Sequence, residues 1–350
     1  MPGYEAEEIA WSDMSPQQQI AREIVKHTVA PILHWVEKPE VSEIAINRPT
    51  EVWLKLRKPD DNGNVWVRRP DPALDRQTME TILHVLANVT NMRDFGPQGN
   101  PVTHGSLPGG HRYCGGYGPN LQYYSGEMDV AGTAIFVCRQ YQRGRNISFS
   151  DYGLERGQEL PHYDLVGDRK ADGADPITRL LNSISRGDHI MISGGTDTGK
   201  TTLMNSMLRR LDSRLRILSV QDTPEINLEQ PNHLHIMMQR QGAATGFTYK
   251  SVVDLITRST PDVVVAGEIS TTNAATIWEL MRGGHGSFMT TIHAENVAGA
   301  ISTFMTRISH TAEGEVRDRE RVAMDMRDML RVVQIVKDPM TNKRTIVQIS

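Results

Sequence analysis

The sequence predicts an α/β protein in which a C-terminal P-loop domain with a mainly parallel sheet follows a smaller α+β domain. Residues 194–201 match the phosphate-binding pattern G-x-x-x-x-G-K-[ST], and they lie between an apolar strand and an amphipathic helix. Strands expected at 215–221 and 262–266 alternate with helical segments, as in a parallel sheet covered on both faces. The polar stretch 142–174 contains scattered glycines and reads as a linker. The expected domains are therefore 1–141 and 175–350.

Composition sets the class of protein. The chain has 350 residues, a formal net charge of −4 and 23% charged residues, which fits a soluble globular protein of two domains. Because the chain is negatively charged overall, it does not attract polyanions as a whole, and we expect no direct nucleic-acid binding. The two cysteines, Cys114 and Cys138, form no C-x-x-C pair, which excludes a disulfide framework and argues against structural zinc.

The sequence also predicts where the chain resides. No apolar stretch is long enough to span a bilayer, and the acidic N-terminus lacks the basic and apolar regions of a signal peptide. We therefore expect a cytoplasmic protein, and peripheral attachment to a membrane complex stays open.

The first domain is expected to mix helices and strands. An amphipathic pattern predicts a helix over 16–37, kinked or split at Pro31. This helix either covers a sheet or docks to a partner or membrane. The other expected elements are strands at 41–47 and 51–57, a helix near 75–90, a glycine-rich irregular tract at 96–132 and a strand at 133–139.

In the second domain the pattern predicts a helix at 177–184 and the P-loop strand at 188–193. After the loop, apolar residues recur at helical spacing, namely Leu203, Met204, Met207, Leu208 and Leu211. Two β-rich segments at 331–337 and 345–349, joined by a turn-rich hexapeptide, predict a closing hairpin.

The P-loop predicts a nucleotide site. Its glycines let successive N–H groups point into one concavity at the start of a helix, where an anion binds. The Lys200 ammonium is expected on the β- and γ-phosphates and the Thr201 hydroxyl on Mg²⁺. The nucleotide-binding residues expected here are Gly194, Gly195, Thr196, Asp197, Thr198, Gly199, Lys200, Thr201 and Thr202.

Carboxylates follow two of the expected strands. Glu268 ends the apolar strand after Pro261, and Asp222 and Glu225 follow the strand at 215–220. Ligands of a parallel sheet lie beyond the carboxyl ends of its strands, so these acids are expected beside the P-loop, where Mg²⁺ and an attacking water bind. The alternatives are an N-capping or salt-bridging role for Glu268 and a turn-capping role for Asp222.

Two histidines flank another expected strand at 288–293. His285 lies among glycines and His293 at the carboxyl end of the strand. Each histidine alone is most simply a core or capping residue. Together in a P-loop domain they indicate sensors of the γ-phosphate.

The ordered set of motifs resembles the hexameric traffic ATPases that drive secretion and pilus motors, which have a RecA-like motor domain. It is most similar to the type IV secretion, conjugation-type branch, which carries a compact N-terminal domain with a segment like 41–53. The chain also lacks the cysteine-rich insertion of the pilus-extension and type II branch. The resemblance covers nearly the whole chain.

The resemblance also implies roles for individual residues. It makes Glu268 catalytic or water-orienting, Glu225 its companion on the Mg²⁺ side, and His285 and His293 switches linked to the γ-phosphate. It further implies that Arg112 and Arg139, from the N-terminal domain, contact bound nucleotide. Two positions depart from the family: Gln221 stands where an acid is usual, and Ser270 where an arginine is common.

The implied function is Mg²⁺-dependent ATP hydrolysis that drives assembly of, or transport through, a type IV secretion system. The implied partners are a homo-hexamer, other secretion-system ATPases and inner-membrane channel components, with the chain at the cytoplasmic face of the inner membrane. Alternatives are a nucleotide-gated assembly platform with little turnover, which the departures at Gln221 and Ser270 suggest, and a pilus or type II secretion motor. A DNA motor on the same core is disfavoured by the net acidity.

Overall fold

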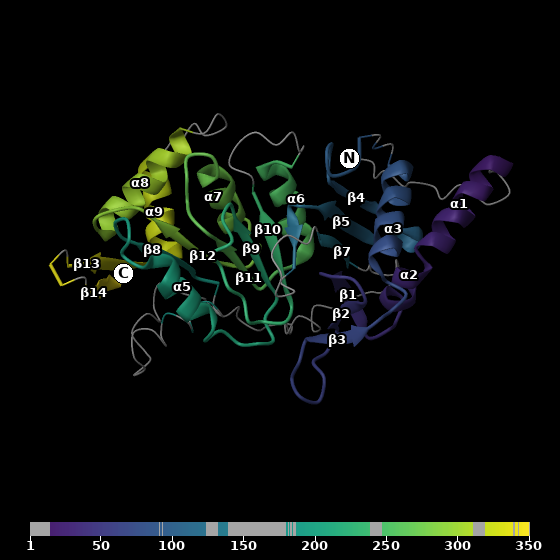
Figure 1. Cartoon of the computed structure of the whole chain (residues 1–350), viewed down its shortest axis with the longest axis horizontal. Helices are drawn as coiled ribbons and strands as arrows, with labels where there is room; N and C mark the ends of the chain where they lie inside the picture. Colours follow the sequence, from purple (N-terminus) through teal and green to yellow (C-terminus); the bar gives the residue numbers. More distant parts are fainter. Residues whose placement is uncertain are drawn as a thin grey trace, which may run out of the picture. The chain divides into compact units, whose positions relative to one another are not determined.

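The computed structural model describes residues 15–90, 92, 94–123, 132–138, 180, 182, 184, 187–238, 247–310, 319–338, 340–341 and 343–349. These residues form two compact units (Figure 1). The first contains residues up to Gly118 and the strand at 132–138, and the second contains the rest. The expected linker at 142–174 and Arg139 lie outside the described residues.

The first unit is a six-stranded antiparallel sheet with helices packed on it. The strand order is β3-β2-β1-β7-β5-β4, and every neighbouring pair is antiparallel. The strands are β1 (Val41–Ile46), β2 (Glu51–Leu56), β3 (Trp66–Pro70), β4 (Val102–Ser106), β5 (Arg112–Gly118) and β7 (Gly132–Cys138). The helices are α1 (Pro16–Thr28), α2 (Ala30–Val36) and α3 (Arg76–Val89).

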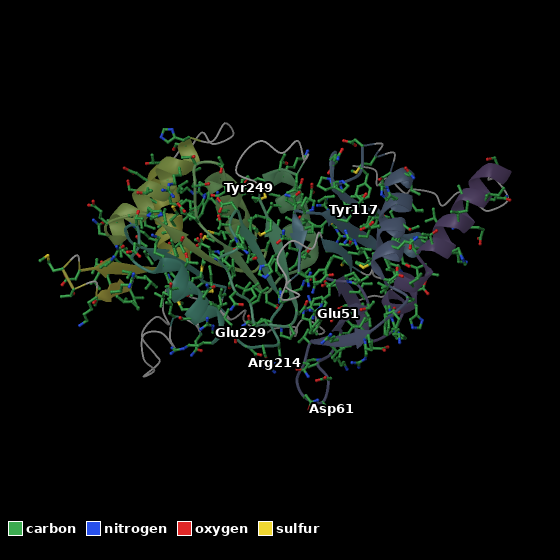
Figure 2. All side chains as sticks on the ribbon, in the orientation of Figure 1. Glu51, Asp61, Tyr117, Arg214, Glu229 and Tyr249 are labelled. Atoms are coloured by element: carbon green, nitrogen blue, oxygen red, sulfur yellow. The ribbon has the colours of Figure 1, made fainter. Side chains whose placement is uncertain are left out.

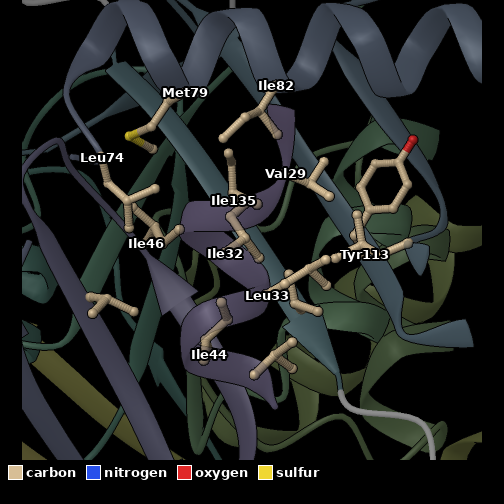
Figure 3. Close-up of a cluster of buried hydrophobic side chains, with 14 of the residues drawn as sticks. Val29, Ile32, Leu33, Ile44, Ile46, Leu74, Met79, Ile82, Tyr113 and Ile135 are labelled. Atoms are coloured by element: carbon tan, nitrogen blue, oxygen red, sulfur yellow. The ribbon is translucent and has the colours of Figure 1, made fainter. Parts of the chain in front are cut away.

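The core of this unit lies between the helices and the sheet (Figure 3). α2 packs on β1, and α3 packs on β4, β5 and β7. α3 begins where the Asp75 carboxylate accepts a hydrogen bond from the Thr78 N–H at 2.7 Å. Glu51, labelled in Figure 2, is a buried carboxylate that ties β2 to its surroundings, because it accepts hydrogen bonds from Arg48 at 2.7 Å and Trp53 at 3.0 Å.

The amphipathic segment at 16–37 is divided as its proline predicted. Pro31 lies in the first turn of α2, where its missing N–H costs no helical hydrogen bond. In α2 the apolar residues Ile32, Leu33 and Val36 are buried, which confirms a helix that covers the sheet. In α1, however, Ile20 and Ile24 are 61% and 55% exposed, so the expected apolar face is only partly buried.

The expectation of an irregular tract at 96–132 was wrong for residues 102–118, which form β4 and β5. Gly115 of this tract lies where the sheet meets α3 and leaves no room for a side chain. A Cβ on Gly115 would lie 2.8 Å from both a methyl of Leu83 and the carbonyl oxygen of Ala134. Glycine therefore permits close packing here rather than marking a loop.

The second unit is an eight-stranded mixed sheet in the order β14-β13-β8-β12-β11-β9-β10-β6. Strands β13 to β10 in that order run parallel, and only the edge strands β14 and β6 are antiparallel. The strands are β6 (Leu121–Gln122), β8 (His189–Ser193), β9 (Ile217–Gln221), β10 (His233–Met237), β11 (Val263–Ala266), β12 (Ser287–Ile292), β13 (Leu330–Lys337) and β14 (Arg344–Ile349). The helices are α5 (Lys200–Leu208), α6 (Tyr249–Ser259), α7 (Ala274–Arg282), α8 (Val297–Ser309) and α9 (Arg319–Met329).

This arrangement confirms the predicted mainly parallel sheet and the closing hairpin. Two edge features were not predicted. β10 contains His233 and His235 and lacks the continuous apolar run of a central strand. β6 belongs to the second unit, although the expected boundary put residues 119–123 in the first; the Asn120 amide donates to the Met237 carbonyl at 2.8 Å. In the described part of the chain, no helix has the length and apolar character needed to cross a bilayer.

Two buried histidines make the second unit sensitive to acid. His189 and His235 are 2% and 3% exposed, and burial lowers the pKa of His189 to about 4 and that of His235 to about 3. In the unfolded chain both titrate near the ordinary value of about 6.5. As the pH falls below that value, both histidines become protonated in the unfolded chain. In the folded chain they stay neutral until the pH approaches their lowered pKa values. Stability is therefore lost between the unfolded and folded pKa values, by about 2 kcal/mol per histidine at about pH 5.

Urea unfolding at about pH 7 and about pH 5 checks this expectation. His189→Asn should reduce the loss of stability on acidification, because an Asn oxygen can replace the imidazole Nδ1 that accepts from the Phe288 N–H at 3.0 Å. His310→Asn, at an exposed position at the end of α8, is the matched control. An equal pH dependence in the wild-type chain and both variants would contradict the prediction.

Candidate active site

The P-loop connects the carboxyl end of β8 to α5 in a tight turn. Asp197 and Gly199 have positive φ angles of 58° and 86°, and a Cβ on Gly194 would lie 2.7 Å from the Ile335 carbonyl oxygen. The Thr198 hydroxyl donates to the Gly195 carbonyl at 2.9 Å and braces the turn. No side chain in the described part of the chain caps α5, whose N-cap is Gly199. The first N–H groups of α5 thus face the loop, which suits an anion.

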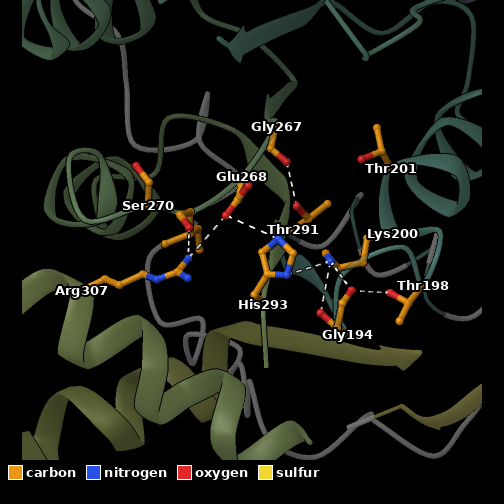
Figure 4. Close-up of polar contacts among 12 residues, drawn as sticks. Gly194, Thr198, Lys200, Thr201, Gly267, Glu268, Ser270, Thr291, His293 and Arg307 are labelled. Carbon is orange, nitrogen blue, oxygen red and sulfur yellow. Dashed lines mark hydrogen bonds and ion pairs between the residues drawn. The ribbon is translucent and has the colours of Figure 1, made fainter. Parts of the chain in front are cut away.

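Lys200 is drawn into this loop (Figure 4). Its side chain is buried, and its ammonium donates to the carbonyl oxygens of Gly194 at 3.1 Å and Gly195 at 2.8 Å. Burial lowers the pKa of Lys200, and the nearby Glu268 carboxylate opposes that shift. The result is a fixed cation at the centre of the loop.

Glu268 lies just beyond β11, and its carboxylate is flanked by two nitrogen groups. Its Oε1 is 3.8 Å from His293 Nε2 and 3.8 Å from Arg307 Nη1, so Glu268 faces cationic and imidazole groups on one side. The backbone here is held in place, because the Asn273 amide donates to the Glu268 carbonyl at 2.8 Å and Thr291 donates to the Gly267 carbonyl at 2.8 Å. The carboxylate itself remains 40% exposed, which leaves it accessible to a reactant.

Sequence reasoning missed Arg307. It comes from α8, and its guanidinium also donates to the Ile269 carbonyl. Nothing in the sequence of this amphipathic helix indicates that Arg307 reaches Glu268, which lies 39 positions earlier in the chain. Ser270, one of the two departures from the family pattern, contacts Thr272 through its hydroxyl at 2.9 Å.

His293 connects the P-loop to Glu268. Its Nδ1 lies 3.3 Å from the Lys200 ammonium and its Nε2 faces Glu268 (Figure 4). Burial and then the Lys200 charge lower the pKa of His293 below its ordinary value, so the ring is neutral at neutral pH and Nδ1 accepts from Lys200.

His285 does not line the cavity that Lys200, Glu268 and His293 line. It precedes β12, whereas His293 follows it, so the two histidines lie at opposite edges of the parallel sheet. Six residues of strand separate them by roughly 20 Å. Within one chain His285 does not line the cavity of Lys200 and His293, and its role as a switch linked to the γ-phosphate stays a prediction.

A second group of oxygens lies beyond β9. The Thr201 hydroxyl donates to Glu225 Oε2 at 3.2 Å, and Asn205 donates to the Glu225 carbonyl at 2.8 Å. Gln221 is buried and accepts, through Oε1, from the N–H groups of Glu225 at 3.0 Å and Ile226 at 2.9 Å. The residue that departs from the family pattern thus shapes the loop that carries Glu225.

These elements enclose one cavity of about 340 Å³. Of the predicted site residues, it is lined by Asp197, Thr198, Gly199, Lys200, Thr201, Thr202, Asp222, Glu225, Glu268 and His293. Gly194 and Gly195 stand behind it as acceptors for Lys200, and Thr196 lines a neighbouring cavity with Gly195. Arg112 is exposed at the start of β5 in the first unit, and Arg139 lies outside the described residues.

The oxygen set suits Mg²⁺ bound together with a polyphosphate. A hydroxyl from Thr201 and carboxylates from Glu225, Asp222 and Glu268 are hard ligands, which Mg²⁺ prefers. Among the described residues no cluster of three or more His, Cys, Asp or Glu side chains forms a metal cage. Mg²⁺ commonly takes one or two carboxylates and completes its shell with phosphate and water, so the residues present fit.

The role of Gln221 can be tested by two substitutions. Gln221→Ala removes the acceptor for the N–H groups of Glu225 and Ile226 and should lower turnover about tenfold by displacing Glu225. Gln221→Glu retains an acceptor oxygen at the same place and should keep most of the activity. Steady-state phosphate release measures both variants. Equal losses would show that the two backbone hydrogen bonds do not determine activity.

The structure of the VirB11 ATPase from the Brucella suis type IV secretion system, in complex with sulphate, shares the fold with a TM-score of 0.78. That match has 19% identity and covers 96% of each chain. In sequence, VirB11 from Rhizobium radiobacter is 24% identical over 322 residues, which cover 86% of this chain and 86% of the relative.

A second relative, the type IV secretion system protein PtlH of Bordetella pertussis, is 26% identical over 303 residues, covering 83% of this chain and 82% of the relative. The family described as Type II/IV secretion system protein matches residues 170–313, which include the whole P-loop site. The chain is thus similar to the type II/IV secretion ATPases in sequence over residues 170–313 and in fold over nearly its whole length. These matches confirm the predicted resemblance, the predicted fold class and the assignment as an ATPase.

Proposed function

We propose that this secretion ATPase hydrolyses ATP with Mg²⁺ and works as a homo-hexamer at the cytoplasmic face of the inner membrane, where it drives assembly of, or transport through, a type IV secretion system. The observation that carries the proposal is the single cavity that joins Lys200, the Thr201–Glu225 pair, Glu268 and His293. The relatives VirB11 and PtlH, named as type IV secretion proteins, support the choice of system.

Each residue of the cavity has a chemical task. The loop N–H groups and the Lys200 ammonium hold the β- and γ-phosphates and neutralise charge that develops on the transferred phosphoryl group. Thr201 and Glu225 are the residues that would hold Mg²⁺, directly or through water. When bound, Mg²⁺ would help to neutralise the negative charge of the phosphates.

Glu268 is the base or orienting group for the attacking water. Its exposed carboxylate accepts a hydrogen bond from the water, while Arg307 and His293 hold it in place. His293 is neutral and already contacts Lys200 at 3.3 Å, so movement of Lys200 onto a phosphate would change the contact between His293 and Glu268. This connection supports the proposed role of His293 as a sensor of the γ-phosphate.

We propose that residues 1–141 and 175–350 act as two domains joined by 142–174, and that Arg112 and Arg139 reach bound nucleotide within the ring. Other secretion-system ATPases and inner-membrane channel components are the proposed partners. The presence of Glu268, with Gln221 shaping the Glu225 loop, favours a hydrolysing enzyme over a platform with little turnover.

The experiment that tests the proposal measures mass and activity together. Light scattering should give six times the mass of one chain in ATP and Mg²⁺, and the same fractions should release phosphate. Arg112→Ala should lower activity per hexamer while the P-loop domain keeps its ATP affinity. A monomer that is fully active, or a hexamer that Mg²⁺ does not activate, would refute the proposal.

A further inference from the structure

Asn205, in the second turn of α5, reaches across to the segment that carries Glu225. Its side-chain amide donates to the Glu225 carbonyl oxygen at 2.8 Å, and its Oδ1 accepts from the Asn227 N–H at 3.0 Å. Building on the proposed Mg²⁺-dependent hydrolysis, we infer that Asn205 is a positioning residue. It holds the Glu225 carboxylate beside Thr201 and thereby sets the affinity of the site for Mg²⁺.

One face of α5 carries both contacts to Glu225. Thr201 and Asn205 are four positions apart, so their side chains lie on the same face of the helix, one turn apart. The Thr201 hydroxyl donates to Glu225 Oε2 at 3.2 Å. The side chain of Glu225 is therefore bonded to the first turn of the helix and its main chain to the second.

The two hydrogen bonds of Asn205 hold a segment that no sheet holds. Residues 225–229 belong to no helix or strand. The Asn205 amide joins the carbonyl group of Glu225 and the N–H of Asn227, the backbone groups on either side of Ile226. A short side chain on a helix has few rotatable bonds, so this pair of bonds fixes both the position and the direction of the segment.

The other contacts of the segment fix it to different parts of the fold. Ile226 is 2% exposed and belongs to the same buried cluster as Met204 of α5. Gln221, at the end of β9, accepts from the N–H groups of Glu225 and Ile226. Gln221 thus ties the segment to the sheet. Asn205 ties it to the helix that begins at the P-loop, where the phosphates are proposed to bind.

The coordination chemistry of Mg²⁺ makes this position important. Mg²⁺ requires near-octahedral geometry, so a carboxylate that moves away from its place binds the ion, or the water on it, less well. Groups that hold metal ligands in place typically contribute about ten- to a hundredfold to metal affinity. Asn205 itself does not line the phosphate cavity, so its loss should affect Mg²⁺ and spare the direct contacts with phosphate.

The test uses Asn205→Leu, which keeps the approximate size of the side chain and removes both hydrogen bonds. Titration calorimetry on the full chain measures the affinity for a non-hydrolysable ATP analogue, AMPPNP, in Mg²⁺ and in EDTA. In Mg²⁺ the variant should bind the analogue about tenfold more weakly than the wild-type chain. In EDTA the two affinities should agree within about twofold.

Hydrogen exchange gives a second readout, without nucleotide or metal. In Asn205→Leu the Asn227 N–H loses its acceptor and should exchange about tenfold faster than in the wild-type chain. The amides of α5 should exchange at the wild-type rate, because leucine is a good helix former and the buried face of the helix is unchanged. This pattern separates a local release of the segment from a general loss of structure.

Asn227→Ala is the matched control. It removes an asparagine side chain that forms no hydrogen bond within the described part of the chain, and it leaves the N–H that Asn205 accepts. It should bind the analogue like the wild-type chain, with and without Mg²⁺. Equal weakening by Asn205→Leu in Mg²⁺ and in EDTA, or no weakening in Mg²⁺, would overturn the inference. A wild-type chain whose affinity for the analogue does not rise with Mg²⁺ would instead overturn the proposed function.

Discussion

Replacing Lys200 by alanine is expected to reduce ATP hydrolysis at least a thousandfold, to the background of the assay. The ammonium is buried and held at the centre of the loop by the carbonyl oxygens of Gly194 and Gly195, so no solvent cation can take its place at the same geometry. A preorganised charge on the transferring phosphoryl group contributes roughly 3–4 kcal/mol, and Lys200 also supplies binding energy in the ground state. Phosphate release and ATP affinity should therefore both fall.

The control for this variant is Lys343→Ala, which removes an exposed cation from the hairpin turn and should leave hydrolysis unchanged. Removal of Lys200 also leaves His293 Nδ1 without its cationic partner, since the two lie 3.3 Å apart. Circular dichroism should show that the variant keeps its secondary structure. Hydrolysis within tenfold of the wild-type rate would mean that this loop is not the catalytic phosphate site.

Replacing Glu268 by glutamine is expected to lower kcat about a thousandfold while ATP affinity stays within a few-fold of the wild-type value. Glutamine keeps the volume of the side chain and the backbone contact with Asn273, so the loop after β11 should not move. It cannot take a proton from water, and it carries no charge to pair with Arg307 or to attract the Lys200 ammonium. The loss should therefore appear in turnover and spare binding.

Glu279→Gln, on the exposed face of α7, is the matched control for the loss of one carboxylate. Rapid-quench measurement of a single turnover separates hydrolysis from product release in the Glu268 variant. A normal single-turnover rate would show that Glu268 acts after the chemical step. A large fall in ATP affinity would show that its main role is to support the loop.

The local parts of the site were predictable from sequence because a strand, a tight turn and a helix are adjacent in the chain. The P-loop between β8 and α5 is such a unit, and so is the position of Glu268 after β11. The rule that parallel strands meet at one edge then placed Glu225 and His293 near Lys200. The same rule, applied to His285, would have put it at the opposite edge, because His285 precedes its strand.

Contacts between distant segments were not predictable in this way. Asp197 pairs with Arg344, 147 positions later, and nothing in either segment indicates the other. The pairing depends on β13 joining the sheet next to β8, which brings the hairpin to the loop. Gln221 is a similar case: its sequence showed only a missing acid, whereas the fold makes its side-chain oxygen the acceptor for the Glu225 loop.

The measurement that tests the account most directly is the number of ATP molecules hydrolysed per chain by the wild-type protein, with Mg²⁺ and with Mg²⁺ removed by chelation. The account predicts many turnovers per chain with Mg²⁺ and none above background without it. Release of one phosphate or less per chain, despite tight ATP binding, would contradict a hydrolysing motor and would identify a nucleotide-gated platform instead.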